Sequence, residues 1–260
     1  MCLLFFDYGA QRFDEVVRPG VLCAFDFDGT LAPIVTMPEK ASLPAGIQRR
    51  LNELCSLTPT AVITGRSLPD IRERLGCEPT FVVGNHGLEG VPGWEGDAAR
   101  HAQLCSEWGG VLAAVLQDHM RFDPGIRIEN KTYSLSVHYR LARDHAKAQA
   151  QLAELFAGLL PGVRVMPGKC VFNLLPQDAV DKGVALERLI KACGAPGAVY
   201  VGDDVTDEDV FRRRQDNILT IRVGRDSASA AEFFVNHRLH VFDVLDSLIS
   251  RLRFGGMAGT

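Results

Sequence analysis

The first third of the chain alternates between two patterns of apolar residues. Continuous apolar runs, typical of strands buried on both faces, alternate with segments whose apolar residues recur at helical spacing. These patterns predict strands at residues 21–27, 61–63 and 81–83 and helices at residues 44–57 and 68–75. Because strands and helices alternate in this order, we expect a parallel sheet with right-handed crossovers.

The pattern changes after a turn-rich segment that has glycine at positions 87, 90, 93 and 96. The next part predicts helices at residues 97–120 and 143–160 and strands at residues 127–130, 133–139, 163–166 and 170–174. The first pattern then returns, with helices predicted at residues 182–193, 207–214 and 241–252 and strands at residues 198–201 and 218–223. The predicted fold class is therefore α/β. A Rossmann-like parallel-sheet core of residues 1–87 and 176–260 is interrupted by a smaller α+β domain of residues 88–175.

The composition is that of an ordinary folded protein with a mildly acidic balance. The 260 residues are 47% hydrophobic and 23% charged, which supplies enough apolar material for a sizeable core. Lys and Arg number 28 against 32 Asp and Glu, so the net charge is −4 at pH 7. A nucleic-acid partner is not expected, because phosphate binding needs a basic surface.

Other features predict a cytoplasmic protein with no membrane contact. No apolar run approaches the roughly 20 residues that span a bilayer. The apolar residues 1–6 are few and lack the basic start of a signal peptide. The seven cysteines are odd in number and include no C-x-x-C pair, which favours reduced thiols.

Two acidic groups lie at the ends of predicted strands. Asp26 and Asp28 belong to the string Asp-Phe-Asp-Gly-Thr, and Asp203 and Asp207 follow the strand at residues 198–201. Parallel sheets bind ligands at the carboxyl ends of their strands, and like charges this close repel unless a cation is bound. Carboxylate oxygens suit Mg²⁺. The structural alternative is an acidic turn in the first group and helix N-caps in the second.

Two further positions predict an anion site. Thr64 precedes Gly65 and a predicted helix, so its hydroxyl and the nearby backbone N–H groups can bind an anion. Lys182 lies at the start of a predicted helix, where the helix dipole disfavours a cation unless an anion is bound there. A common turn and a solvated lysine are the ordinary alternatives.

Taken in order, these four segments resemble the haloacid dehalogenase superfamily of phosphatases over nearly the whole chain, in the subclass that carries an α+β cap. Within the superfamily, more local strings resemble trehalose-6-phosphate phosphatases. These strings lie at residues 84–89, 129–134, 138–140, 168–169 and 202–208. The resemblance implies that residues 1–87 and 176–260 form the superfamily core and that residues 88–175 form the cap.

The resemblance also implies roles for the core residues. Asp26 would be the nucleophile, and Asp28 would protonate the departing sugar oxygen and then activate water. Asp26, Asp203 and the backbone carbonyl of Asp28 would hold Mg²⁺. Asp207 would hold a metal-bound water or orient Lys182, and Thr64 and Lys182 would bind the transferring phosphate oxygens.

A second set of residues is implied to bind the substrate. It comprises Arg66, Asn85, His86, Gly87, Glu89, Lys131, His138, Arg140, Lys169 and Asn173. For His138 and Arg140 the alternative is a solvated sheet face. Asn173 departs from the family, which usually has Glu at this position. Asn can bind a sugar hydroxyl but supplies no charge, so the departure concerns the sugar contacts more than the chemistry.

The implied activity is the Mg²⁺-dependent hydrolysis of trehalose 6-phosphate to trehalose and phosphate, a step of trehalose biosynthesis, through an aspartyl-phosphate intermediate. Two alternatives stay open. One is a phosphatase of a related sugar phosphate, such as sucrose 6-phosphate or a glucosyl- or mannosyl-3-phosphoglycerate. The other is a phosphosugar sensor without turnover. A monomer is expected, with a trehalose-phosphate synthase as a candidate partner.

Overall fold

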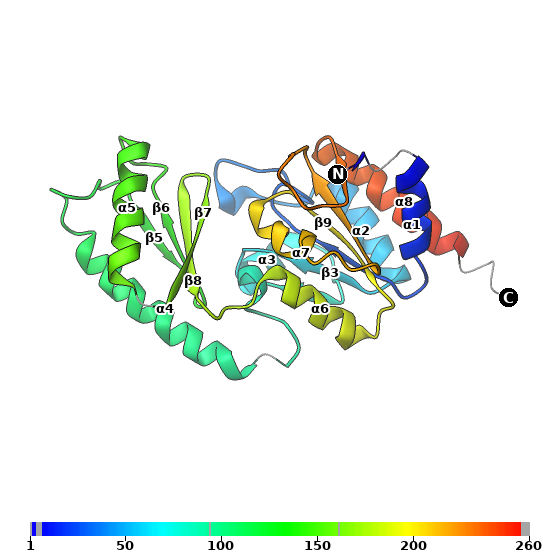
Figure 1. Cartoon of the computed structure of the whole chain (residues 1–260), viewed down its shortest axis with the longest axis horizontal. Helices are drawn as coiled ribbons and strands as arrows, with labels where there is room; N and C mark the ends of the chain where they lie inside the picture. The colour runs from blue at the N-terminus through cyan, green and yellow to red at the C-terminus, as the bar shows by residue number, and fades with distance from the viewer. Residues whose placement is uncertain (1, 4–6, 94, 161, 256–260) are drawn as a thin grey trace. The chain divides into compact units, whose positions relative to one another are not determined.

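The structure is a computed structural model that describes residues 2–3, 7–93, 95–160 and 162–255. The chain forms two compact units (Figure 1). The core unit comprises Met1–Pro92 and Val180–Thr260, and the inserted unit comprises Gly93–Ala179. The sequence pattern places the corresponding breaks after residues 87 and 175.

The described strands of the core unit form one parallel sheet, as the alternating pattern predicts, in the order β1-β11-β10-β9-β2-β3-β4. The strands are β1 (Cys2–Leu3), β2 (Leu22–Phe25), β3 (Thr60–Ile63), β4 (Phe81–Val83), β9 (Ala198–Gly202), β10 (Ile218–Val223) and β11 (Phe233–Val235). Phe25 pairs with Val62 on one side and with Val201 on the other. This register brings the residues that follow β2, β3 and β9 to one edge of the sheet.

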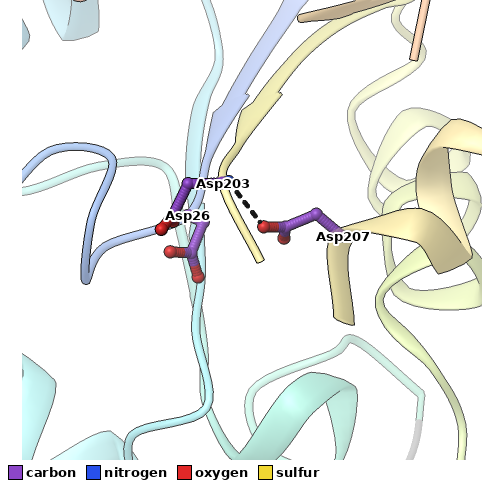
Figure 2. Close-up of side chains that lie close together, drawn as sticks. All are labelled: Asp26, Asp203 and Asp207. Atoms are coloured by element: carbon purple, nitrogen blue, oxygen red, sulfur yellow. Dashed lines mark hydrogen bonds between the residues drawn. The ribbon is translucent and has the colours of Figure 1, made fainter. Parts of the chain in front are cut away.

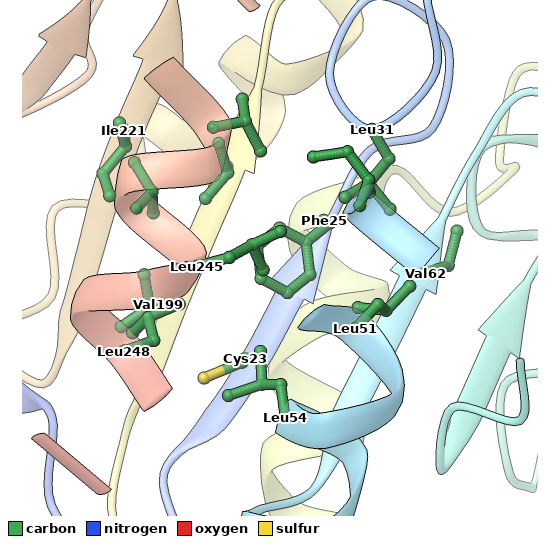
Figure 3. Close-up of a cluster of buried hydrophobic side chains, with 14 of the residues drawn as sticks. Cys23, Phe25, Leu31, Leu51, Leu54, Val62, Val199, Ile221, Leu245 and Leu248 are labelled. Atoms are coloured by element: carbon green, nitrogen blue, oxygen red, sulfur yellow. The ribbon is translucent and has the colours of Figure 1, made fainter. Parts of the chain in front are cut away.

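Helices cover the sheet on both faces, which is why every residue of its central strands β2, β3 and β9 is buried. The helices of this unit are α1 (Asp7–Val16), α2 (Ala45–Leu57), α3 (Leu68–Leu75), α6 (Lys182–Cys193), α7 (Glu208–Phe211) and α8 (Val241–Gly255). The short 3₁₀ segments are η1 (Pro38–Lys40), η2 (Asn85–Gly87), η3 (Val205–Asp207) and η4 (Arg238–His240). On one face, Phe25 packs in a buried cluster with Leu51 of α2 and Leu245 of α8 (Figure 3).

The inserted unit has an antiparallel sheet in the order β5-β6-β8-β7, with helices packed against it. Its elements are α4 (Glu95–Val115), β5 (Arg127–Asn130), β6 (Leu135–His138), α5 (His145–Leu159), β7 (Val163–Gly168) and β8 (Val171–Pro176). Alternate residues of the strands, such as Val137 and Phe172, enter a core with Leu112 of α4 and Phe156 of α5. The residues between them in the strands therefore lie on the opposite face of the sheet.

The pattern misses β1, α1 and β11. Strand β1 has only two residues, too few to show a periodicity, whereas α1 has ten residues of which most are polar or small. Three helices are shorter than predicted by three or more residues, among them α5, which begins at His145 and ends at Leu159. Helix α4 ends at Val115, and the chain then turns at Asp118, whose carboxylate accepts a hydrogen bond from the Met120 N–H. The predicted helix at residues 207–214 is only α7, preceded by η3. Within the described ranges, none of the helices has both the length and the apolar character that a bilayer crossing requires.

Candidate active site

Three carboxylates converge at the carboxyl edge of the core sheet. Asp26 follows β2 and Asp203 follows the neighbouring strand β9, while Asp207 ends η3 (Figure 2). One oxygen atom from each carboxylate lies within 4.8 Å of the others. The two acidic groups of the sequence therefore form one site, because the parallel pairing of β2 with β9 aligns their ends.

Lys182 is the cation of this site. Its Nζ donates to Oδ1 of Asp26 and to Oδ1 of Asp207, each at 2.7 Å, and its side chain is only 1% exposed. Burial by itself lowers the pKa of a lysine, but here the charges of Asp207 and Asp26 raise it above its usual range. Lys182 therefore stays charged, which explains a lysine in the first turn of α6.

Asp207 is fully engaged by protein donors. Its Oδ1 accepts from Lys182 and, at 2.6 Å, from the hydroxyl of Tyr200. Its Oδ2 accepts from the backbone N–H groups of Asp203 at 2.8 Å and Asp204 at 2.9 Å. A carboxylate offers about four lone pairs, and all of them are used here. Of the two roles implied for Asp207, this arrangement favours the orientation of Lys182.

Tyr200 is a residue that the sequence reasoning missed. It is completely buried in β9. Its neighbours Val199 and Val201 face the cluster that contains α2, so the Tyr200 side chain lies on the opposite face of the sheet. Burial and the charges of Asp207 and Asp26 raise the pKa of its hydroxyl well above the usual value. The sequence does hold one signal for it. Tyr200 is a hydroxyl-bearing residue within an otherwise aliphatic strand, and a buried hydroxyl needs a hydrogen-bond partner.

Glycine is required where the two acidic loops meet. Gly29 has a φ of 88°, and a Cβ atom there would come within 2.0 Å of Oδ2 of Asp203. The Thr30 hydroxyl donates to Oδ1 of Asp203 at 3.1 Å. The Gly-Thr part of the first motif thus lets the Asp203 carboxylate approach and then holds it.

The acidic cluster fits a divalent cation. Burial and the charges of Asp207 and Asp204 raise the pKa of Asp203 to about 7. Burial also raises the pKa of Asp26 well above its usual value, against the opposing effect of Lys182. Both carboxylates are thus poorly compensated by the protein alone, and hard oxygen ligands of this kind bind Mg²⁺ and similar ions.

We expect a divalent cation, tested as Mg²⁺, to bind more weakly as the pH falls below about 7. At lower pH the Asp203 carboxyl carries a proton that the ion must displace, because its pKa is raised to about 7. The affinity should fall by up to about tenfold per pH unit, as measured by titration calorimetry between about pH 8 and pH 6. Buffers of different ionisation enthalpy should reveal proton release at the acidic end. A dissociation constant that does not change over this range would contradict the assignment of Asp203.

The loops after β3 and β4 interlock beside the acidic cluster. Thr64 is buried, and its hydroxyl accepts from the N–H of Arg66 at 3.2 Å. Asn85, His86 and Gly87 have φ values of 47°, 58° and 117°. The His86 ring occupies the space where Gly65 would carry a Cβ atom, 2.4 Å from that position. This left-handed turn explains why the loop after β4 lies against the Thr64 loop.

Two residues predicted near the substrate have partners within the core unit. Arg66 binds the Asp28 carboxylate with Nε at 2.6 Å and Nη2 at 2.7 Å. Glu89 is half-buried, and its Oε2 accepts from the N–H of Leu68 at the start of α3, at 2.7 Å. Burial raises the pKa of Glu89, against the hydrogen bonds from Leu68 and Asn85. The Glu89 carboxylate thus anchors the first turn of α3.

The remaining predicted residues belong to the inserted unit. Lys131 starts the turn between β5 and β6, where its carbonyl accepts from the Tyr133 N–H at 2.9 Å. Nε2 of His138 lies 2.9 Å from a carboxylate oxygen of Glu129. Arg140 donates to the Lys169 carbonyl at 3.4 Å.

Asn173 lies on β8, on the sheet face opposite the packed helices. Its Oδ1 accepts from the hydroxyl of Ser136, its register partner on β6, at 2.7 Å. His138 follows Ser136 by two residues and therefore shares that face. His138 and Asn173 thus lie on one face of the sheet, Lys131 and Lys169 lie in its hairpin turns, and Arg140 lies in the loop after β6.

The parallel-sheet core with its inserted α+β unit has the fold of the haloacid dehalogenase-like proteins. A haloacid dehalogenase-like hydrolase from Bacteroides thetaiotaomicron shares the fold, with a TM-score of 0.59 at 16% identity over 87% of this chain and 98% of that one. The profile of the trehalose-phosphatase family matches residues 24–237, and the chain belongs to that family.

Individual relatives agree with this family. A trehalose-phosphate phosphatase of Mycobacterium ulcerans is 34% identical over 251 residues, which cover 91% of this chain and 63% of that protein. A solved trehalose-6-phosphate phosphatase related protein has a TM-score of 0.72 at 26% identity, over 91% of this chain and 99% of that one. The chain spans less than two thirds of the length of the curated relatives it matches.

Proposed function

We propose that this protein is a Mg²⁺-dependent phosphatase that hydrolyses trehalose 6-phosphate to trehalose and phosphate. The observation that carries the proposal is the Asp26 carboxylate, buried at the sheet edge between Lys182 and the Asp203 loop. Family membership and the M. ulcerans relative support the substrate. The same site in a protein without turnover would gain nothing from a buried carboxylate whose charge is costly.

The chemistry follows from the positions of the core residues. Asp26 attacks phosphorus and forms an aspartyl-phosphate, and the bond to the sugar oxygen breaks. Asp28 gives a proton to that oxygen and then takes one from the water that cleaves the intermediate. Lys182 and Thr64 bind the transferring oxygens, and Asp207 holds Lys182 in place.

Mg²⁺ would be held by Asp26, Asp203 and the backbone carbonyl of Asp28. It would offset the repulsion between an anionic nucleophile and a phosphate dianion. The pKa values of Asp26 and Asp203, both raised by burial, support this assignment because a bound cation compensates those charges.

The inserted unit is assigned to the sugar. Lys131, His138, Arg140 and Lys169 supply donors, and Asn173 supplies an amide whose oxygen is already bonded to Ser136. Asn173 thus offers a neutral amide, with both a donor and an acceptor, where the family usually presents a carboxylate. This observation favours, as a second candidate, a phosphatase of a related sugar phosphate.

We place the protein in the cytoplasm as a monomer. The free thiols of Cys23, Cys55, Cys77, Cys105, Cys170 and Cys193 support a reducing compartment. Light scattering of the purified protein, alone and with a trehalose-phosphate synthase, tests the oligomeric state and the proposed partner together.

Phosphate release from a panel of esters tests the function. The panel holds trehalose 6-phosphate, sucrose 6-phosphate, glucose 6-phosphate, glucosyl-3-phosphoglycerate and p-nitrophenyl phosphate, each with and without Mg²⁺. We expect Mg²⁺-dependent preference for trehalose 6-phosphate. Preference for another sugar phosphate would show that the sugar contacts assigned to the inserted unit are wrong, while the chemistry of the core unit would stand. Asn173 would then be the first residue to substitute. No release from any ester would support the sensor instead.

The Lys131→Ala variant should lose activity on the sugar phosphate only. We expect kcat/KM for trehalose 6-phosphate to fall by about tenfold or more, since a charged hydrogen bond to a hydroxyl contributes about 1.5–3 kcal/mol. Hydrolysis of p-nitrophenyl phosphate should not change, because that ester has no sugar. Lys147→Ala, an exposed lysine on α5, is the matched control. Equal losses on both esters would contradict a role in specificity.

A further inference from the structure

Asp28 is held in a single direction by Arg66. The guanidinium donates to both oxygens of the carboxylate, from Nε at 2.6 Å and from Nη2 at 2.7 Å. This two-point contact fixes an orientation, which a single hydrogen bond does not. The Arg66 side chain is only 11% exposed, and its guanidinium lies over the Phe27 ring, 5.5 Å from the centroid. The orientation of Asp28 therefore depends on the orientation of Arg66.

Arg66 is itself held from the other side by a carboxylate with no assigned role. Its Nη1 donates to Oδ2 of Asp70, in the first turn of α3, at 2.6 Å. Oδ1 of Asp70 accepts in turn from Nε of Arg74 at 2.9 Å. Burial opposes ionisation, but hydrogen bonds from Arg74 and Arg66 hold the pKa of Asp70 below its usual range.

We call the chain of contacts from Asp28 through Arg66 and Asp70 to Arg74 the relay. It ends on the backbone of the segment that leads from the loop at residues 26–30 to α2. Arg74 donates from Nη1 to the carbonyl of Ala41 at 3.1 Å and to the carbonyl of Glu39. The side chains of Arg66 and Arg74 are both mostly buried, at 11% and 13% exposure. The two guanidinium groups are therefore more restricted than those of an exposed ion pair, while the carboxylates of Asp28 and Asp70 are 38% and 32% exposed.

A purely structural explanation accounts for only part of this relay. Asp70 and Arg74 are four residues apart on α3 and stabilise the helix as an ordinary i,i+4 pair. That pair needs no third member. A guanidinium is planar, so the contact of Nη1 with Asp70 and the Phe27 ring beneath the group together limit the plane in which Nε and Nη2 meet Asp28.

We propose that Asp70 and Arg74 are positioning residues that act through Arg66 to fix the direction of the Asp28 carboxyl. The inference rests on the proposed function, in which Asp28 protonates the departing oxygen. A proton donor that turns away from that oxygen loses much of its effect, because general acid catalysis depends on alignment. The relay should therefore affect the breaking of the ester bond more than the binding of the ester.

The leaving group makes this distinction measurable. A sugar alkoxide is a strong base and needs a proton as it departs, whereas p-nitrophenolate departs without one. A misaligned Asp28 should therefore slow the first turnover of trehalose 6-phosphate and spare that of p-nitrophenyl phosphate. A general loss of folded protein would slow both esters equally.

The test compares Asp70→Asn with Asp246→Asn, with Mg²⁺ present. Asp246 is a matched control, because Arg50 binds it through two hydrogen bonds, at 2.7 and 2.9 Å, on a part of the core unit without catalytic residues. For Asp70→Asn we expect release of the sugar in the first turnover to slow by about tenfold, with KM and first-turnover release of p-nitrophenol unchanged. Asp246→Asn should change none of these. Equal losses on both esters, or no loss, would overturn the inference.

A second readout does not depend on activity. In ¹⁵N-labelled protein the Arg66 Nε–H should exchange slowly with solvent, and Asp70→Asn should speed its exchange while Asp246→Asn does not. Arg74→Gln should act in the same direction and replaces Asp70→Asn if that variant fails to fold. If the unmodified protein hydrolyses no ester, the proposed function fails and the Nε–H exchange alone decides the inference. Equal exchange rates in the unmodified protein and both relay variants would overturn it.

Discussion

The Asp26→Asn variant should lose turnover by roughly 10⁴-fold or more while remaining folded, because an amide cannot form the acyl-phosphate bond. The fold should tolerate the change. The Asp26 carboxylate is buried and its pKa is raised, so its charge is a cost to the folded state that the neutral amide removes. Lys182 keeps its hydrogen bond to Asp207. Phosphate release and urea unfolding measure the two effects.

Asp204→Asn is the matched control for this variant. Asp204 lies in the neighbouring acidic loop, its side chain is exposed, and its carboxylate accepts from the Val205 N–H, a cap that Asn also provides. It should retain most of the activity. Borohydride trapping of the quenched reaction should locate the acyl phosphate at Asp26 by mass. Substantial turnover by Asp26→Asn, or a trapped label elsewhere, would show that Asp26 is not the nucleophile.

The Lys182→Met variant should be both inactive and much less stable. Lys182 is the cation that the buried carboxylates of Asp26 and Asp207 share, each at 2.7 Å. Removing one member of a buried ion pair leaves an uncompensated charge, which costs about 3–5 kcal/mol. We expect a fall of this size in the free energy of unfolding, measured in urea without metal.

Lys191→Met provides the comparison on the same helix. Lys191 is exposed near the end of α6, and its replacement should change the free energy of unfolding by no more than about 0.5 kcal/mol. Mg²⁺ should not restore the activity of Lys182→Met, since the metal does not replace the lysine at the phosphate. An unfolding free energy equal to that of the Lys191→Met variant would contradict the role of Lys182 as counter-charge.

The core unit is the part of the fold that the sequence predicts best. The parallel sheet is confirmed, and the predicted bounds of α3, α6, β4 and β10 agree with the structure. These elements have strong periodicity or continuous apolar runs, and α6 has Asp181 as a side-chain N-cap and Gly194 as a left-handed C-cap. The short β1 and β11 are strands only because they pair with a neighbouring strand, and the local sequence does not predict that pairing.

The sequence by itself determined the acidic strand ends and therefore the kind of chemistry. Asp26 and Asp203 end neighbouring parallel strands, and a parallel sheet aligns such ends wherever they occur in the chain. The identity of these residues and their place after buried strands were sufficient for that conclusion.

Only the tertiary structure decided which side chains hold which others. Tyr200 reaches Asp207, Glu89 turns to the N–H of Leu68, and Arg66 joins Asp28 to Asp70. Each of these contacts depends on side-chain direction and on the packing of neighbouring loops. Arg66 and Asp28 are 38 residues apart in the chain, and no local spacing relates them. A sequence pattern indicates which residues come to one edge of a sheet, but the partners there are chosen by burial and hydrogen-bond geometry in three dimensions.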